Sequence, residues 1–144
     1  MALPPDLQSD LQTVMSDSAI MTSHEWSAHG TCSGVAAPDY FRIAATLMQQ
    51  ASDVLDPVFT RAAGQTLSSR AVRDSVEAAF GPGAGKRVGL TCRDAAGPGS
   101  VVYEVRFSLP AVTDLYAAGG ALSLGKQLAG APTVGPGCGR ALVP

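Results

Sequence analysis

Apolar residues at helical spacing, together with helix start and stop signals, predict four helices in the first 80 residues. These run from the Pro4-Pro5-Asp6 entry to Ser16, over 20–31, over 39–52, and from Ser68 to Phe80. The stretch 39–52 has the clearest apolar stripe, and Pro57 is expected to interrupt the chain after it. Ser68 is a good N-cap residue, and Leu67 and Val72 are placed as a hydrophobic staple around it. The aromatic and methionine stripes of these helices are predicted to belong to the core.

A period of two replaces the helical spacing later in the chain. Val88, Leu90 and Cys92 alternate with their neighbours, and apolar and polar positions alternate over 101–108. Such alternation is typical of strands with one buried face. The Gly-, Ala- and Pro-rich stretch 119–144 shows little periodicity and is predicted to be irregular. The predicted fold class is α+β, with helices packed on an antiparallel sheet.

Size and composition fit one soluble globular domain that covers residues 1–144. The hydrophobic fraction is 46% and the charged fraction 15%, unlike those of a disordered chain. The formal net charge of −2 predicts no basic surface of the kind that binds nucleic acids tightly and non-specifically, although a small cleft can hold local positive charge. No apolar run reaches transmembrane length, and residues 1–18 lack the features of a secretory signal.

The nine residues from His24 to Cys32 contain both histidines of the chain, its only tryptophan, a glutamate and a cysteine. A helix turns by about 100° per residue, so His24, Glu25 and His29 share one flank while Trp26 points away toward a possible core. One imidazole can accept a proton while another donates one. The segment is therefore a candidate for acid–base chemistry.

Three other interpretations of this segment are open. A zinc site of the His-Glu-x-x-His kind needs histidines four residues apart, whereas His24 and His29 are five apart and splay by about 140°. Cys32 follows His29 by three residues and is a candidate nucleophile activated by an imidazole. In the third interpretation the segment is a polar helix end with a buried tryptophan and two solvated histidines.

The same nine residues resemble the second active-site segment of the ribonuclease T2 family, His-Glu-Trp-x-Lys-His-Gly-Thr-Cys. Seven of its eight specified positions match, as His24, Glu25, Trp26, His29, Gly30, Thr31 and Cys32. Looser likenesses follow in the aromatic pair of 38–41, in the cysteine-containing 90–92, in the glutamate-containing 103–105 and at Cys138. The resemblance implies a ribonuclease T2-like α+β fold.

The resemblance also implies an endoribonuclease that cleaves RNA by transesterification through a 2′,3′-cyclic phosphate, without a metal or other cofactor. Carried over by position, His29 is the catalytic acid–base residue, His24 binds the phosphate, and Glu25 helps to hold and polarise the transition state. The expected partner is single-stranded RNA and neither DNA nor a membrane. We expect a monomer that is secreted or periplasmic in its full-length form.

Two departures from the family pattern lower the expected activity. The first active-site segment of the family, which carries a second catalytic histidine, is missing, so we expect an N-terminally truncated member or, less favoured, a remnant lineage. Ala28 stands where the family has a lysine, which removes a cation that would face the phosphorane charge. The alternative function is a catalytically weak or inactive fragment that binds RNA or protein.

The three cysteines are an odd number, which is unusual in an exported protein. The family resemblance implies a disulfide between Cys92 and Cys138 and leaves Cys32 without its usual partner. The other interpretation is three reduced, buried cysteines in a cytosolic protein.

Overall fold

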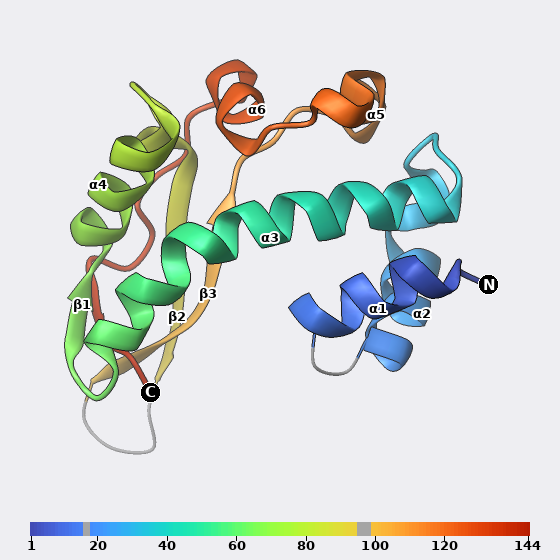
Figure 1. Ribbon diagram of the computed structural model, residues 1–144. Coiled ribbons are helices and arrows are strands. Elements are labelled where there is room, and N and C mark those ends of the chain that lie inside the picture. Colours follow the sequence, from blue (N-terminus) through green and yellow to red (C-terminus); the bar gives the residue numbers. More distant parts are fainter. Residues whose placement is uncertain (16–17, 95–98) are drawn as a thin grey trace. The chain divides into compact units, whose positions relative to one another are not determined.

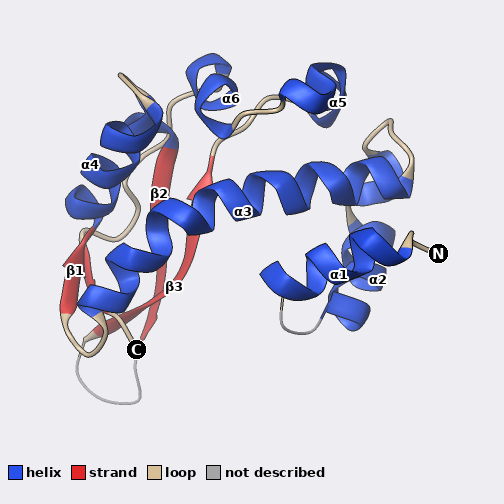
Figure 2. Cartoon of the chain, in the orientation of Figure 1, coloured by secondary structure: helices blue, strands red, loops and turns tan. Residues whose placement is uncertain are grey.

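The computed structural model describes residues 1–15, 18–94 and 99–144 (Figure 1). Its helices are α1 (Pro5–Val14), α2 (Ser18–Ala28), α3 (Ala37–Ala62), α4 (Ser69–Phe80), α5 (Val112–Ala118) and α6 (Leu124–Gly130). Short 3-10 turns are η1 (Gly30–Cys32), η2 (Ala84–Arg87) and η3 (Gly119–Ala121), and the strands are β1 (Thr66–Ser68), β2 (Val88–Asp94), β3 (Ser100–Phe107) and β4 (Arg140–Leu142). The predicted α+β class is confirmed (Figure 2). The helix end predicted at Ser16 lies outside the described residues, as does the side chain of Tyr103.

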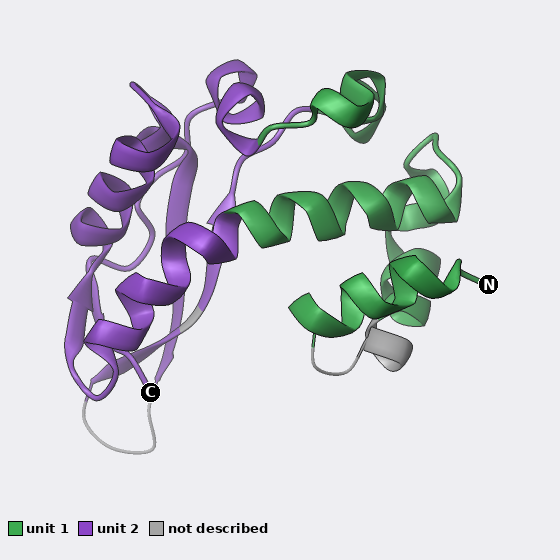
Figure 3. Cartoon of the chain, in the orientation of Figure 1, with its two compact units in different colours: residues 1–50, 111–123 green, residues 51–110, 124–144 purple. Residues whose placement is uncertain are grey.

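The chain forms two compact units (Figure 3). Unit 1 consists of residues 1–50 and 111–123, and unit 2 consists of residues 51–110 and 124–144. Helix α3 gives its first half to unit 1 and its second half to unit 2. The expectation of a single domain over 1–144 remains a prediction.

Unit 1 has a small apolar core built from α1 and the first half of α3. Leu7 and Leu11 of α1 are each 1% exposed, and Phe41 and Ala45 of α3 pack with them. In each pair the residues are four positions apart and therefore lie on one helical face, which is the pattern that the sequence predicts. An ion pair between Asp6 and Arg42 connects the same two helices at 3.1 Å, at the exposed edge of this core.

Helix α3 corrects the expectation that Pro57 interrupts the chain, because the helix continues through this proline to Ala62. A proline inside a helix loses one backbone hydrogen bond and costs about 3 kcal/mol. Leu55 is buried and Val58 and Phe59 are half-buried on either side of Pro57. Burial of these apolar side chains offsets the local cost, which is why the helix does not end there.

The four strands of unit 2 form one sheet in the order β1-β4-β3-β2. The pairs β1–β4 and β2–β3 are antiparallel, as the sequence predicts. The pair β3–β4 is parallel, so the prediction of an antiparallel sheet is wrong for this pair. Parallel neighbours need a crossover connection, and the chain provides one when it passes through α5 and α6 before it returns as β4.

The last part of the chain is more regular than its composition predicts. Leu124 and Leu128 lie four residues apart in α6 and are at most 1% exposed. Ala141 of β4 and the adjacent Val143 are buried as well. The prediction of an irregular stretch over 119–144 is therefore wrong for α6 and β4, because packing stabilises elements too short to show a period.

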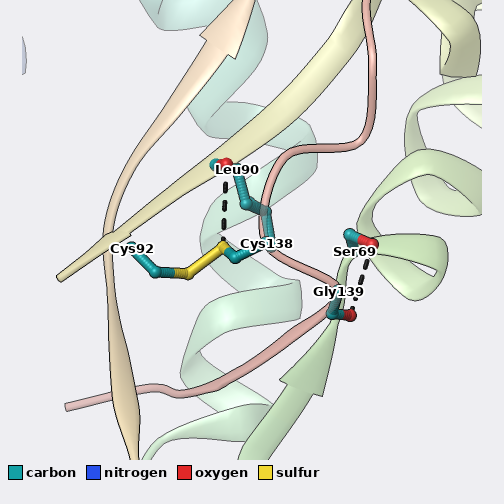
Figure 4. Close-up of a disulfide and its surroundings, with 5 residues drawn as sticks. All are labelled: Ser69, Leu90, Cys92, Cys138 and Gly139. Carbon is teal, nitrogen blue, oxygen red and sulfur yellow. Dashed lines mark hydrogen bonds between the residues drawn. A yellow bond between two sulfur atoms is a disulfide. The ribbon is translucent and has the colours of Figure 1, made fainter. Parts of the chain in front are cut away.

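A disulfide joins Cys92 of β2 to Cys138, which precedes β4 (Figure 4). The two Cα atoms are 6.1 Å apart, within the usual range for a disulfide. Beside this bond, the backbone N–H and the hydroxyl of Ser69 both donate to the carbonyl oxygen of Gly139. The third cysteine, Cys32, is a free, exposed thiol. Both parts of the predicted cysteine pattern are confirmed, and the alternative of three reduced cysteines is wrong.

Residues 134–138 lie along the side of β2 that is not paired with β3. Val134 N–H donates to the Lys86 carbonyl at 2.8 Å, Leu90 N–H to the Pro136 carbonyl at 2.9 Å, and Cys138 N–H to the Leu90 carbonyl at 3.3 Å. A Cβ atom on Gly137 would be 2.9 Å from the carbonyl carbon of Leu90 and closer still to its oxygen. Only glycine therefore allows this close approach to β2.

Candidate active site

Helix α2 of unit 1 carries His24 and Glu25, and His29 follows directly after its last residue, Ala28. The His29 N–H donates to the Glu25 carbonyl at 2.9 Å, so one more helical hydrogen bond forms before the chain turns into η1. The imidazole centroids of His24 and His29 are 6.4 Å apart, and the rings are nearly perpendicular. Both histidines are exposed and Glu25 is half-buried. The structure thus brings together the two imidazoles that the sequence places on one flank.

Trp26 anchors the opposite side of α2 in the core of unit 1. Its indole packs edge-on against Tyr40 with centroids 5.9 Å apart, and lies 6.4 Å from the ring of Phe41. It also contacts the cluster that contains Leu7. This confirms the expectation that Trp26 packs toward the core, and the packing turns the histidine flank toward solvent.

Gly30 starts the turn that follows His29 and is buried against the indole of Trp26. A Cβ atom at this position would be 2.9 Å from Cζ3 of the ring, 3.1 Å from Cδ2, and closer still to Cε3. On its other side the Gly30 carbonyl accepts hydrogen bonds from the backbone N–H and the hydroxyl of Ser33. The backbone next to His29 is therefore held on both sides.

Tyr40 is a neighbour of the site that sequence reasoning assigned only to the core. Its phenol is half-buried, and burial raises its pKa; the negative charge of Glu25 raises the pKa further. The carboxylate of Glu25 is thus near enough to interact electrostatically with the Tyr40 hydroxyl, which stays protonated. The only sequence signal for this neighbour is the aromatic pair that opens the third predicted helix.

Ala28 is exposed, so the position where the family has a lysine supplies no cation to the histidine face. Unit 1 contains one Lys or Arg residue, Arg42, whose guanidinium is committed to the Asp6 carboxylate at 3.1 Å. The same unit contains six acidic residues, namely Asp6, Asp10, Asp17, Glu25, Asp39 and Asp114. Within unit 1, the imidazoles are therefore the side chains of this face that can carry positive charge toward a phosphate.

The structure also bears on the two other chemical interpretations of the motif. In the part of the chain that the structure describes, no three His, Cys, Asp or Glu side chains cluster in a way that could hold a metal ion. Cys32 is exposed at the end of η1, and among the described contacts no hydrogen bond joins its thiol to His29. The geometry therefore favours the pair of imidazoles over the thiol as the reactive groups.

Comparison with known proteins agrees with this geometry. The sequence matches the model of the Ribonuclease T2 family over residues 2–118. This match includes the whole segment from His24 to Cys32 and the paired strands β2 and β3. Comparison with curated proteins gives no significant match. Since the family match covers well over half of the 144 residues and contains the histidine face, the chain belongs to the ribonuclease T2 family.

Proposed function

We propose that this chain is an endoribonuclease that cleaves single-stranded RNA by transesterification. In this proposal His29 transfers a proton, His24 holds the scissile phosphate, and Glu25 helps to hold and polarise the transition state. The observation that supports it most directly is the pair of exposed imidazoles, 6.4 Å apart, on a chain of the ribonuclease T2 family. At this separation both rings can reach oxygens of one phosphate group through hydrogen bonds of about 2.9 Å.

The reaction needs no cofactor, because the substrate supplies its own nucleophile. The ribose 2′-hydroxyl loses its proton to a base as its oxygen bonds to phosphorus, and the bond from phosphorus to the 5′-oxygen breaks. The departing oxygen takes up a proton, and the product keeps a 2′,3′-cyclic phosphate. DNA lacks the 2′-hydroxyl and is not a substrate. His29 accounts for one of the two proton transfers, so we expect slow turnover from this chain.

A second candidate function is binding of RNA or protein without cleavage. Two observations favour it: Ala28 in place of a lysine, and Arg42 as the single Lys or Arg residue of unit 1. Stabilisation of phosphorane charge by one positioned cation is typically worth a few kcal/mol. Its loss reduces the rate without removing the histidine face.

We further propose that the protein acts as a monomer in an oxidising compartment, secreted or periplasmic. The disulfide between Cys92 and Cys138 supports the oxidising compartment, since such bonds persist mainly outside the cytosol. Among the helices that the structure describes, none is both long and apolar enough to cross a membrane.

The test is release of cyclic phosphate from a ribodinucleotide, measured over a range of about pH 4 to 8. We expect slow cleavage that varies with pH, no cleavage of the matching deoxydinucleotide, and unchanged rates in EDTA. His29→Ala should abolish the reaction, whereas His24→Ala should mainly weaken substrate binding. Undiminished cleavage by His29→Ala contradicts the assigned role, and loss of activity in EDTA contradicts the mechanism. No cleavage by the parent chain, together with RNA binding, favours the second candidate.

A further inference from the structure

Basic residues are divided unequally between the two units. Unit 2 contains nine of the ten Lys and Arg residues but only six of the twelve Asp and Glu residues. Unit 1, which carries the histidine face, contains Arg42 alone. Binding of a nucleic acid depends on cationic side chains that replace counterions along the phosphates. An RNA substrate therefore finds most of its electrostatic attraction on unit 2.

Unit 2 offers a groove where several of these cations meet. The groove lies between α4, η2 and residues 133–136 and has a volume of about 860 Å³. This is within the usual range for ligand sites, roughly 300–1,000 Å³. Arg70, Arg73 and Lys86 line it. Its size and its cations suit a nucleotide-sized part of a polyanion.

The Arg73 guanidinium is fixed in the wall of the groove. Its Nε–H donates to the Gly85 carbonyl, and Nη2 donates to the Val134 carbonyl at 3.0 Å. A guanidinium has five N–H donors, so others remain to meet a ligand. Arg70 and Lys86 are exposed. Lys86 is near enough to Glu77 for its charge to help lower the pKa of that carboxyl, but no described hydrogen bond or ion pair holds the ammonium in one place. One cation of the groove is thus preorganised and two are accessible.

Two carboxylates, Asp74 and Glu77, also line the groove. Their contacts with neighbouring groups weaken the repulsion that they exert on a bound anion. Both oxygens of Glu77 accept backbone N–H groups, from Gly83 and Gly85, each at 2.7 Å. The Asp74 carboxylate is 3.8 Å from Arg70, one turn away on α4, which is a weak exposed pair. The Glu77 charge is therefore directed into the turn, and Asp74 can be displaced from Arg70 by a stronger anion.

We propose that this groove of unit 2 binds the phosphate backbone of an RNA strand through Arg70, Arg73 and Lys86, as a contact additional to those of the histidine face. The inference rests on the proposed function for its choice of RNA as the ligand. Contacts to phosphates position a strand but carry little sequence information. The groove therefore binds RNA of different sequences with similar affinity.

The test measures binding of a fluorescein-labelled RNA oligonucleotide of mixed sequence by fluorescence anisotropy at several KCl concentrations. All proteins carry His29→Ala, so that cleavage does not interfere. The double variant Arg70→Gln/Lys86→Gln is compared with a control pair, Arg61→Gln/Lys126→Gln. The control residues are also exposed, belong to unit 2 and lie outside the groove. Both pairs remove two positive charges, so the long-range change is matched.

For single strands, each lost phosphate contact lowers the slope of log affinity against log salt by about 0.7. We expect the groove variant to lose about 1.4 from this slope and to bind several-fold more weakly at low salt, while the control pair keeps the parent slope. Equal losses in both pairs, or no RNA binding by the parent, would overturn the inference. Competition by polyglutamate as effective as that by unlabelled RNA would overturn it too, because the site would then be one for acidic proteins.

The outcomes separate this inference from the proposed activity. Binding is measured without cleavage, so a chain that binds RNA through the groove but never cleaves it contradicts only the proposed activity. A chain that cleaves RNA while the two double variants bind alike contradicts only the groove. Circular dichroism of each variant checks that the fold is kept, and the exposure of all four side chains makes this the expected result.

Discussion

Replacing Gly30 with alanine perturbs the turn that carries His29 and leaves every polar group in place. The φ angle of Gly30 is not positive, so alanine is compatible with its backbone conformation. The cost arises from the added methyl group, which would be 2.9 Å from Cζ3 of Trp26 and closer still to Cε3. The indole cannot retreat, because it packs against Tyr40 and Phe41.

The magnitude follows from this geometry. Carbon atoms in contact are normally about 3.5–4.0 Å apart, so the backbone at position 30 must move by roughly 1 Å. Overpacking of this kind typically costs about 1–3 kcal/mol of unfolding free energy. Because His29 is the next residue, its imidazole moves too, and a misplacement of about 1 Å can reduce a rate by up to about a hundredfold.

The assay combines urea unfolding, followed by far-UV circular dichroism, with proton NMR of the imidazole Cε1–H resonances. The chain has two histidines, so a His24→Gln variant assigns both signals. Gly120→Ala is the matched control, because a Cβ atom there meets nothing within 4 Å. We expect Gly30→Ala to lose stability relative to this control and to move the His29 resonance more than that of His24.

A double-mutant cycle with Trp26→Leu tests the cause. Leucine lacks the ring atoms that the new methyl group would meet, so Gly30→Ala should cost much less when Trp26→Leu is already present. The reasoning is refuted if Gly30→Ala costs the same with and without Trp26→Leu. It is also refuted if the single variant is as stable as Gly120→Ala and leaves the His29 resonance in place.

Three further predictions concern charge, pH and covalent linkage. Ala28→Lys should raise kcat for cyclic-phosphate release by roughly tenfold, because it puts a cation beside the histidine face; an unchanged kcat contradicts this placement. Hydrogen bonds from the backbone of the 83–85 turn lower the pKa of Glu77, so Glu77→Gln should reduce Tm near neutral pH. This difference should shrink as the pH falls below the ordinary glutamate pKa toward its lowered value, and a difference that persists in acid rules out the carboxylate as its source. Replacing Cys92 and Cys138 with serine should remove roughly 2–4 kcal/mol from the free energy of unfolding in urea, and an unchanged midpoint and slope argue that the bond does not stabilise the fold.

Helices with recognisable capping residues at their ends could be predicted from the sequence. The hydroxyl of Ser68 accepts the Ala71 N–H at 3.1 Å and caps α4 as expected. Leu67 and Val72, placed as a staple around this cap, are both buried. Helix α3 was predicted too short, because burial on both sides of Pro57 outweighs a local rule. Tertiary packing that stabilises an element leaves little trace in a short window of sequence.

In the candidate site, too, features set by local spacing could be predicted, whereas features set by tertiary packing could not. The helical period alone placed His24 and His29 on one flank, and their rings are indeed neighbours. The spacing of four between Trp26 and Gly30 is compatible with their contact, but the closeness of Tyr40 to Glu25 depends on how α2 packs against α3, which no spacing within the motif indicates. The unequal distribution of Lys and Arg residues between the two units could not be predicted from the net charge of −2, because the residues of each unit are not contiguous in the sequence.

The strip of chain at 134–138 has a consequence for solubility. Strand β2 is at the end of the sheet order, and an open strand edge is a template on which another chain can pair. Backbone bonds of Val134, Pro136 and Cys138 cover part of this edge, and the link to Cys92 keeps the strip in place. The disulfide thus protects the edge as well as the fold. Under reducing conditions we expect the protein to begin to self-associate before its helices unfold.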